Sequence, residues 1–271
     1  PLGIAFLGPL GTFSESAATK HFGHAARLSP QSSIDDVFRE VESGHAHYAV
    51  VPVENSTEGA VGRTMDLLLA TPLKICGEVV VRVHQNLMST ETDLDKITKV
   101  YSHAQSLAQC HEWLNRMLPK AQRVSVGSNA QAAQLAAAEP GTAAIAGEMA
   151  ATRYSVPILF RNIEDSPNNT TRFWVLGRQD VAASGRDKTS LILSAPNRPG
   201  AVVDLIEPLK RHGVSMTHLE SRPSPDRLWE YFFFLDIEGH VSDARVAAAL
   251  AEVKAQSSYF KVVGSYPAAV L

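Results

Sequence analysis

A short polar stretch at residues 165–173 holds side chains that could bind an anion. Asn169, Thr171 and Arg172 stand just before an apolar run that begins at Phe173. Amides and hydroxyls donate hydrogen bonds, and a guanidinium pairs with a carboxylate through two parallel bonds. The same residue types also form local turns that lead into strands, and this alternative explains the stretch equally well when it is considered alone.

Three further polar stretches favour a binding site. They lie at residues 8–15, 51–59 and 102–110, and each has the pattern of a strand end that opens onto a loop or a helix. In open α/β sheets, ligands bind outside the carboxyl ends of the strands. The candidate ligand-binding residues in these stretches are Thr12, Ser14, Asn55, Ser56, Thr57, His103 and Gln105.

Glu54 lies next to the donors of the second stretch and has two alternative roles. Beside an anionic ligand its pKa would be raised, so it could supply a proton. It could instead orient Asn55. Thr12 also has an alternative role as the cap of a first helix, because Glu15 follows it in the pattern of a capping box.

The charge pattern favours a small molecule as the partner. The 271 residues carry a formal net charge of -3, and no run of Lys or Arg provides a surface for nucleic acid or membrane. We find no Gly-rich phosphate loop, no Cys pair and no set of His ligands, so neither a metal nor an organic cofactor is expected. Two cysteines, Cys76 and Cys110, and the lack of a signal-like start predict a cytoplasmic protein.

Short apolar runs alternate with helical patterns in the first two thirds of the chain. The runs are residues 4–7, 48–53, 98–101, 123–126 and 143–146. This alternation predicts an α/β layer structure with mostly parallel strands. A β-rich stretch at 73–88 leaves the first group of strands and 158–176 returns to it, which predicts two lobes joined by two crossovers. We place one lobe at about 1–79 plus 157–178 and the other at about 80–156.

The residues after 178 are expected to form a separate unit. Residues 179–188 lack a sustained apolar period and are interpreted as a linker. Residues 189–271 follow, with strand, helix, strand, strand, helix and strand at 189–195, 201–212, 214–220, 228–237, 243–255 and 260–266. This βαββαβ order predicts an α+β unit of ferredoxin-like type.

The four polar stretches, in this order, closely resemble the prephenate dehydratase family. Residues 197–202 and 219–223 resemble the phenylalanine-binding motifs of its regulatory ACT domain. The resemblance covers nearly the whole chain and implies lobes arranged as in type II periplasmic binding proteins, with the active site between them. It also implies decarboxylative dehydration of prephenate to phenylpyruvate, carbon dioxide and water, regulated by L-phenylalanine.

The resemblance further implies roles for individual residues. Thr171 would be the principal catalytic residue, and because its hydroxyl is weakly acidic, we expect it to hydrogen-bond the leaving hydroxyl or to relay a proton to it. Arg172 would either bind a substrate carboxylate or support its loop through Glu164 or Asp165. With Glu54 as a second catalytic candidate, the expected substrate-binding residues are Thr12, Ser14, Asn55, Ser56, Thr57, His103, Gln105, Asn169, Arg172 and Phe173.

For the effector, the resemblance implies a site between the ACT domains of two subunits, and hence a homodimer or homotetramer. The expected effector-binding residues are Asn197, Gly200, Ala201, Val202, Leu219, Glu220, Ser221 and Arg222. The first motif usually reads Gly-Ala-Leu and here reads Gly-Ala-Val, which should slightly alter the size of the pocket. Gly200 would let a ligand approach the backbone closely, beside the free amides of a helix start.

Two other functions stay open at this point. Arogenate dehydratase acts on a substrate that carries an ammonium where prephenate has a keto oxygen. A non-catalytic amino-acid sensor could use the same two-lobed cleft, although the intact segment at 171–173 argues against it. We expect a monofunctional prephenate dehydratase, because no helical chorismate mutase segment precedes Gly3 and no dinucleotide-binding motif is present.

Overall fold

Residues 1–271 are described by a computed structural model, in which hydroxyl side chains begin the first two helices. Thr12 accepts a hydrogen bond from Glu15 N at the start of α1 (Phe13–Phe22). Ser33 accepts one from Asp36 N at the start of α2 (Ile34–Glu42). Each bond pairs an amide that the first helical turn leaves free. Both helices begin where the sequence pattern places them.

The first lobe is built on a sheet whose strands come from separate parts of the chain. Its order is β2 (Arg27–Gln31), β1 (Gly3–Leu7), β3 (Tyr48–Asn55), β11 (Thr170–Gly177) and β5 (Lys74–Arg82), with β4 (Gly59–Ala60) beside β3. β1, β2 and β3 are parallel, whereas β11 is antiparallel to both of its neighbours. β2 is not among the predicted strands, because Pro30 and polar residues interrupt this edge strand.

Alternating side chains divide the core of the first lobe into two layers. Ile4 and Phe6 of β1 pack in one cluster with residues of α1. Ala5, between them, belongs to a second cluster, which includes residues of α2 and α3 (Gly62–Leu68). Successive residues of a strand point to opposite faces, so α1 covers one face of the sheet, and α2 and α3 cover the other.

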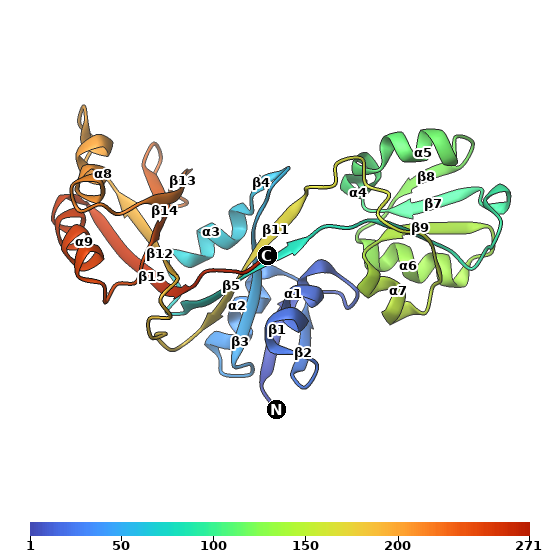
Figure 1. The fold of residues 1–271 in the computed structure, drawn as a ribbon, viewed down its shortest axis with the longest axis horizontal. Coiled ribbons are helices and arrows are strands. Elements are labelled where there is room, and N and C mark those ends of the chain that lie inside the picture. The colour runs from blue at the N-terminus through green and yellow to red at the C-terminus, as the bar shows by residue number, and fades with distance from the viewer.

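The second lobe has a sheet of its own. The order is β10 (Ile158–Phe160), β6 (Asn86–Met88), β9 (Thr142–Ala146), β7 (Lys99–Ser102) and β8 (Gln122–Ser125). Its helices are α4 (Ala104–Gln109), α5 (His111–Met117), α6 (Asn129–Ala138) and α7 (Glu148–Tyr154), and a 3-10 turn lies at Leu94–Lys96. Two crossovers join the lobes, between β5 and β6 and between β10 and β11 (Figure 1). The return crossover lies after residue 160, later than the expected boundary at 157, because β10 pairs with β6.

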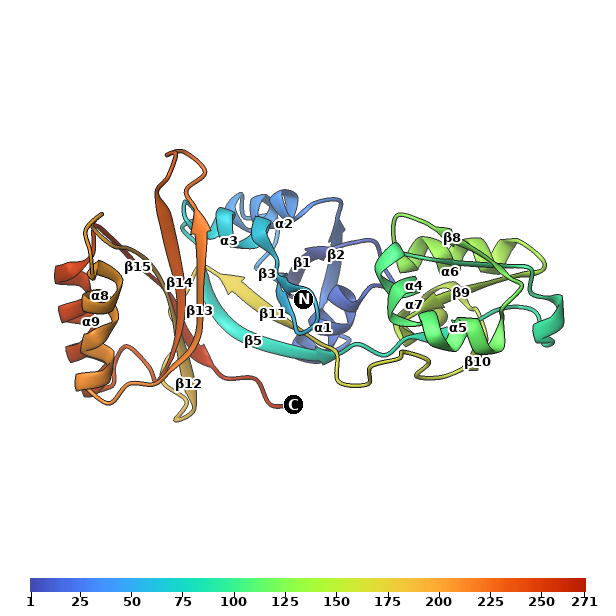
Figure 2. The same cartoon turned by 90° about the horizontal axis from the view of Figure 1, so that it is seen from above.

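The C-terminal unit has the predicted order of elements. They are β12 (Asp187–Ser194), α8 (Ala201–Arg211), β13 (Met216–Pro223), β14 (Tyr231–Glu238), α9 (Ala244–Gln256) and β15 (Tyr259–Pro267), and the sheet order is β13-β14-β12-β15. α8 and α9 pack on one face of this antiparallel sheet. Ile192, Phe234 and Tyr266 on the other face join a core cluster of the first lobe. Figure 2 shows the resulting layers, with α8 and α9 on the side away from the first lobe.

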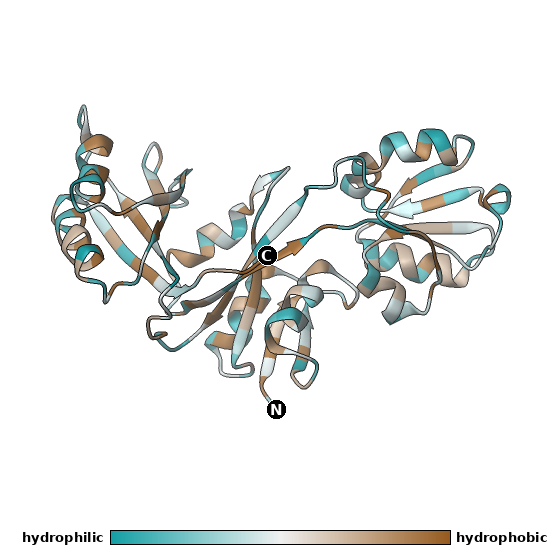
Figure 3. Ribbon diagram, viewed as in Figure 1, coloured by the Kyte–Doolittle hydropathy of each residue, from teal (hydrophilic) through white to brown (hydrophobic).

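Apolar residues are concentrated in the strands, whereas the helices mix apolar and polar residues along their length (Figure 3). This distribution is typical of helices that cover a sheet with one face and meet water with the other. None of the helices combines the length and the hydropathy that a membrane span requires.

The C-terminal unit and the first lobe meet at a close backbone contact between β15 and β5. A Cβ atom added to Gly264 would overlap the Ile75 carbonyl oxygen and would lie 2.8 Å from Ile75 N. Nearby, Lys261 Nζ donates to the carbonyls of Leu68 at 2.8 Å and Thr71 at 2.7 Å, where α3 ends and its last carbonyls need partners. The seam therefore requires glycine at position 264.

We expect Gly264→Ala to lower the free energy of unfolding by about 1 to 3 kcal/mol, because the added methyl group meets backbone that cannot move aside. Urea denaturation of the full chain measures this change. Gly3→Ala is the matched control, since its Cβ would meet nothing nearer than 3.4 Å. If both variants were as stable as the unaltered chain, the seam would not be as tight as described.

Candidate functional site

Thr171 and Asn55 face each other across the paired strands β11 and β3. Asn55 Oδ1 accepts hydrogen bonds from Thr57 N at 2.9 Å and Glu58 N at 3.3 Å, which fixes the orientation of the amide. Asn55 Nδ2 donates to Thr171 Oγ1 at 2.9 Å. Because Thr171 Oγ1 accepts this bond, its own hydroxyl hydrogen stays available for a ligand.

Asn169 gathers the neighbouring hydroxyls around one oxygen. Its Oδ1 accepts from Ser56 Oγ and from Thr57 Oγ1, each at 3.1 Å. Ser56 Oγ in turn accepts from Thr170 N at 2.9 Å. Asn169 is 4% exposed, and its Nδ2 has no hydrogen-bond acceptor in the structure. The hydroxyls thus orient a buried amide whose donor is unpaired, and an anion would satisfy it.

A pocket of about 320 Å³ adjoins these residues and takes its walls from both lobes. The first lobe and the return crossover contribute Thr57, Glu58, Glu164, Asp165, Ser166 and Asn169, and the second lobe contributes Gln105, Ala108 and Gln109. The fold therefore brings three of the expected residues, Thr57, Gln105 and Asn169, to one polar pocket. Thr171 is not among its lining residues and lies beside it, bonded to Asn55.

Glu58 lines the same pocket, although the sequence analysis does not single it out. Burial raises the pKa of its carboxyl, and the charge of His103 from the second lobe opposes part of that shift. His103 is exposed and caps α4, where its Nδ1 accepts from Gln105 N at 3.3 Å. In the sequence, the position of Glu58 directly after the donors Ser56 and Thr57 could have identified it as a site residue.

The start of α1 joins the two lobes and does not line this pocket. Thr12 Oγ1 accepts from Glu15 N at 3.4 Å, so Thr12 has its alternative role as the helix cap. Glu15 is fully buried and pairs with Arg153 Nε of α7 at 2.9 Å. Ser14 is buried beside them, and Phe173 is buried in the core cluster under α1. The structure thus places Thr12, Ser14 and Phe173 in packing and capping roles.

Arg172 points to the opposite face of β11, towards the C-terminal unit. Its Nε donates to Glu54 Oε1 at 3.0 Å, and its Nη1 donates to Glu78 Oε1 at 3.1 Å and to Asp236 Oδ2 at 2.8 Å. The side chain is 9% exposed. Since consecutive residues of a strand point to opposite faces, a strand that presents Thr171 to the cleft cannot present Arg172 there.

The expected roles of Glu54 and Arg172 at the substrate therefore need correction. Glu54 Oε1 is bound by Arg172, and Glu54 Oε2 lies 3.5 Å from His218 Nδ1 of the C-terminal unit. The loop support expected of Arg172 is also absent. Glu164 instead pairs with His84 Nδ1 at 2.8 Å, and Asp165 accepts from the first amides of α5.

Arg172, Glu54, Glu78, Asp236 and Lys188 form a cluster, which we call the interdomain cluster. Burial disfavours the charge of Arg172, but Asp236 and the other groups around it outweigh that effect and raise its pKa above the usual range. Burial would raise the pKa of Glu78, yet the Ala269 amide and Lys188 Nζ, at 2.9 Å, leave that pKa below its usual value. Both residues are therefore charged at neutral pH.

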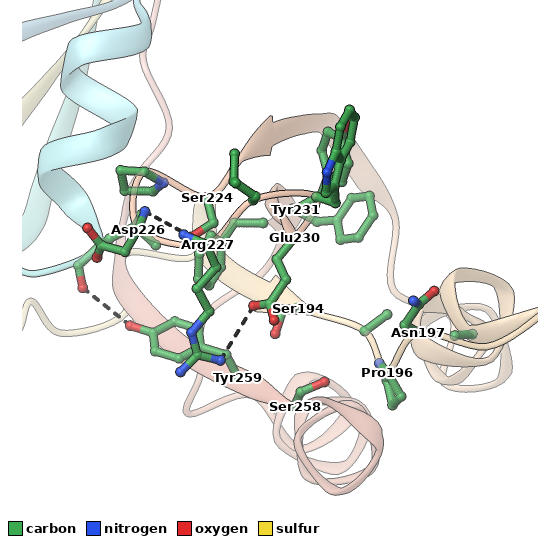
Figure 4. Close-up of a pocket in the computed structure, with 18 of the residues that line it drawn as sticks. Ser194, Pro196, Asn197, Ser224, Asp226, Arg227, Glu230, Tyr231, Ser258 and Tyr259 are labelled. Atoms are coloured by element: carbon green, nitrogen blue, oxygen red, sulfur yellow. Dashed lines mark hydrogen bonds and ion pairs between the residues drawn. The ribbon is translucent and has the colours of Figure 1, made fainter.

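A larger pocket of about 940 Å³ lies in the C-terminal unit, between the β12–α8 loop, the β13–β14 loop and the end of α3 (Figure 4). Asn197, Ala201 and Val202, all expected at the effector site, line it. Gly200 precedes α8 with a φ of 75°, and a Cβ added there would meet no atom within 4 Å. The backbone at this helix start is thus open to a ligand.

The second expected effector motif is divided between the two faces of β13. Leu219 and Ser221 are exposed, whereas Glu220 and Arg222 are half-buried. Arg222 Nε and Nη2 bind Asp66 of α3 at 2.9 and 3.0 Å. None of these four residues of β13 lines the larger pocket, so the structure brings only residues of the first motif to it.

Comparison with known proteins covers both parts of the chain. Residues 4–181 match the prephenate dehydratase family and residues 189–255 match the ACT domain. The bifunctional chorismate mutase/prephenate dehydratase of Neisseria gonorrhoeae is 56% identical over 100% of this chain and 76% of its own length. The prephenate dehydratase of Amycolatopsis methanolica is 36% identical over 97% of this chain and 88% of its own length. A crystal structure of prephenate dehydratase in complex with L-Phe from Arthrobacter aurescens has a TM-score of 0.90 at 33% identity, over 98% of this chain and 90% of that chain.

The lowered pKa of Glu78 predicts a pH-dependent contribution to stability. A carboxyl with a depressed folded-state pKa stabilises the fold above its unfolded value, about 4.3, and loses this effect as pH falls through the folded value. We expect the free energy of unfolding to fall less with acid in Glu78→Gln than in the unaltered chain. The values for the two proteins should therefore converge at low pH. Urea denaturation over a pH series measures them.

The matched control for Glu78→Gln is Glu148→Gln, since Glu148 forms a surface ion pair with a side chain 68% exposed. Its pH profile should follow that of the unaltered chain. A Glu78→Gln profile parallel to both would contradict the assigned role of Glu78.

Proposed function

The chain belongs to the prephenate dehydratase family, and we propose that prephenate reacts at the pocket between its lobes, beside the Asn55–Thr171 pair. The enzyme is a carbon–oxygen lyase that forms phenylpyruvate, carbon dioxide and water in L-phenylalanine biosynthesis. The ring carboxylate leaves as carbon dioxide, its bonding electrons complete the aromatic ring as the carbon–oxygen bond breaks, and the departing hydroxyl takes up one proton to leave as water. Because the ring becomes aromatic, the protein has only to hold the substrate, stabilise the leaving hydroxyl and limit access of water.

The observation that carries this proposal is the hydrogen bond from Asn55 Nδ2 to Thr171 Oγ1. It occupies a lone pair of the threonine and leaves the hydroxyl hydrogen to donate to the substrate. Negative charge develops on the leaving oxygen as the carbon–oxygen bond lengthens, so a positioned donor binds the transition state more strongly than the ground state. We assign Thr171 this donor role.

A substrate carboxylate would bind at Asn169 and Gln105. Asn169 Nδ2 is a buried donor with no acceptor, which costs free energy until a ligand supplies one. Ser56 and Thr57 keep this amide oriented by donating to its oxygen. Gln105 lines the pocket from the second lobe and can approach the same ligand from the opposite wall. The two residues would thus hold the substrate between the lobes.

The larger pocket of the C-terminal unit is the proposed site for L-phenylalanine. Free amides at the start of α8 suit the carboxylate of an amino acid, and the open backbone at Gly200 allows its close approach. The relative from Arthrobacter aurescens is described in complex with L-Phe, which supports this ligand. Binding there would regulate turnover in the cleft.

A homodimer or homotetramer through the C-terminal units is supported by exposed apolar residues at this pocket. Leu228 and Trp229 are 90% and 87% exposed, and both line it. Val203 of α8 is 66% exposed and directly follows Val202, which also lines the pocket. Apolar residues gathered on a surface in this way mark contact sites, and a second copy of the unit would cover them.

Arogenate stays a second candidate substrate because of Glu58. Its carboxyl lines the pocket, and its pKa is raised by burial. The ammonium of arogenate would stabilise the charged form of this carboxyl, whereas the keto oxygen of prephenate would not. The ratio of kcat/KM for the two substrates decides between them, and a larger value with arogenate would make the chain an arogenate dehydratase.

Two further expectations stay predictions. One is that the enzyme is monofunctional. It stays a prediction because the Neisseria gonorrhoeae relative carries two named activities. The cytoplasm is the other, and it is supported by the two free cysteines, Cys76 and Cys110, since a reducing compartment keeps thiols unpaired.

We expect Thr171→Ala to lower kcat by about 10² to 10⁴ while the protein stays folded, because the positioned donor is lost. Thr171→Ser is the matched control, since it keeps a hydroxyl and should retain most of the activity. Phenylpyruvate formation measures turnover, and circular dichroism checks the fold. Turnover by Thr171→Ala at the unaltered rate would remove Thr171 from the mechanism.

We expect Gly200→Val to weaken L-phenylalanine binding by at least about tenfold, because the side chain blocks the backbone and disfavours a positive φ. Gly185→Val is the matched control. Gly185 also has a positive φ, 92°, with nothing within 4 Å of an added Cβ, but it is not adjacent to a lining residue of the pocket, whereas Gly200 directly precedes the lining residue Ala201. Isothermal titration calorimetry measures both affinities, and equal losses in the two variants would contradict the assigned effector site.

A further inference from the structure

We propose that Arg172 is a positioning residue through which the C-terminal unit controls the Asn55–Thr171 pair. This inference rests on the proposed function and specifies how the effector site and the cleft communicate. Arg172 does not touch the substrate pocket. It would act through the two strands that carry the pair, β3 and β11.

The guanidinium of Arg172 is held by carboxylates from three strands of two structural units. Glu54 comes from β3, Glu78 from β5 and Asp236 from β14, with N–O distances of 3.0, 3.1 and 2.8 Å. Glu78 is 7% exposed and Asp236 is 3% exposed. Ion pairs between buried groups are screened little by water, so the position of each carboxylate strongly affects the guanidinium.

Two residues of the cluster are direct neighbours in the chain of the proposed catalytic pair. Arg172 follows Thr171 in β11, and Glu54 precedes Asn55 in β3. The register pairs Arg172 with Glu54 and Thr171 with Asn55. A shift of the Arg172–Glu54 pair therefore moves the backbone that carries the Thr171 hydroxyl. Displacements of about 1 Å in a reacting group can change a rate by about 10².

The other side of the cluster leads to the proposed effector pocket. Asp236 of β14 pairs in register with His218 of β13. His218 Nδ1 lies 3.5 Å from Glu54 Oε2, so both strands contact the cluster. The loop that joins these strands, residues 224–230, lines the pocket of about 940 Å³. A ligand there contacts the same hairpin that holds Asp236 and His218.

The interdomain cluster holds one more carboxylate than it holds Arg and Lys side chains. Arg172 and Lys188 face three carboxylates, and Ser190 Oγ also donates to Asp236 Oδ1 at 2.6 Å. Arg172 Nη2 is buried and has no acceptor, so this arrangement leaves one of its donors unpaired. Neutralising Asp236 leaves two cations with two carboxylates, and Asn has nearly the same shape. Asp236→Asn is therefore expected to fold.

The test compares the response to L-phenylalanine in the unaltered chain and in Asp236→Asn. The ratio of kcat/KM at zero and at saturating L-phenylalanine reports the coupling, and allosteric coupling typically amounts to about 5- to 150-fold. In Asp236→Asn we expect this ratio to fall below about 2-fold, while calorimetry still shows saturable binding of L-phenylalanine. A role in stability alone would not remove the ratio and keep the binding.

Lys261→Met is the matched control, because it also removes contacts between the C-terminal unit and the first lobe. Lys261 Nζ binds carbonyls at the end of α3, and none of these hydrogen bonds goes to β3 or β11. This variant should keep the ratio of the unaltered chain. An unchanged ratio in Asp236→Asn would overturn the proposal, and so would equal losses in both variants, because any loosening of the seam would then suffice.

Two other results are interpreted differently. An unaltered chain without turnover or without a response to L-phenylalanine would contradict the proposed function itself, before any variant is compared. If Asp236→Asn does not fold, His218→Gln replaces it, since this half-buried residue makes the parallel contact to Glu54. A reduced ratio in His218→Gln then supports the proposal, and an unchanged ratio overturns it.

Discussion

The placement of neighbouring side chains on opposite faces where β3 and β11 meet at residues 54–55 and 171–172 is the constraint on which the rest of this structure depends. Thr171 and Asn55 lie on one face of the paired strands, and Arg172 and Glu54 lie on the other. One face therefore belongs to the cleft and the other to the C-terminal unit. The return crossover from the second lobe also leads into β11, so the lobe connection, the proposed chemistry and the proposed regulation meet at two adjacent strands (Figure 1).

Because Arg172 is buried between the first lobe and the C-terminal unit, the two units share part of their core. A buried guanidinium needs partners for its charge, and one of them, Asp236, comes from that unit. The Arg172 guanidinium also lies 5.2 Å from the ring centre of Trp174, whose side chain belongs to the cluster shared by both units. Since breaking a buried ion pair is costly, the two units stabilise each other and their relative positions are coupled.

Much of the fold could be predicted from the sequence, because caps and apolar periods are local signals. Thr12 and Ser33 begin their helices as the patterns indicate, and the βαββαβ order of the C-terminal unit is confirmed. The boundary near residue 157 is wrong by several residues, since the pairing of β10 with β6 is a long-range contact that no local pattern encodes. Arg172 is the more instructive case. Alternation already placed it opposite Thr171, but its partner Asp236 lies 64 residues away in the chain.

The most direct test of this account is phenylpyruvate formation from prephenate by the unaltered chain, with and without L-phenylalanine. The account predicts turnover that changes when L-phenylalanine is added, because the cleft and the effector pocket are connected through Arg172. Saturable ligand binding without turnover of prephenate or arogenate would contradict it, and the two-lobed cleft would then be that of an amino-acid sensor.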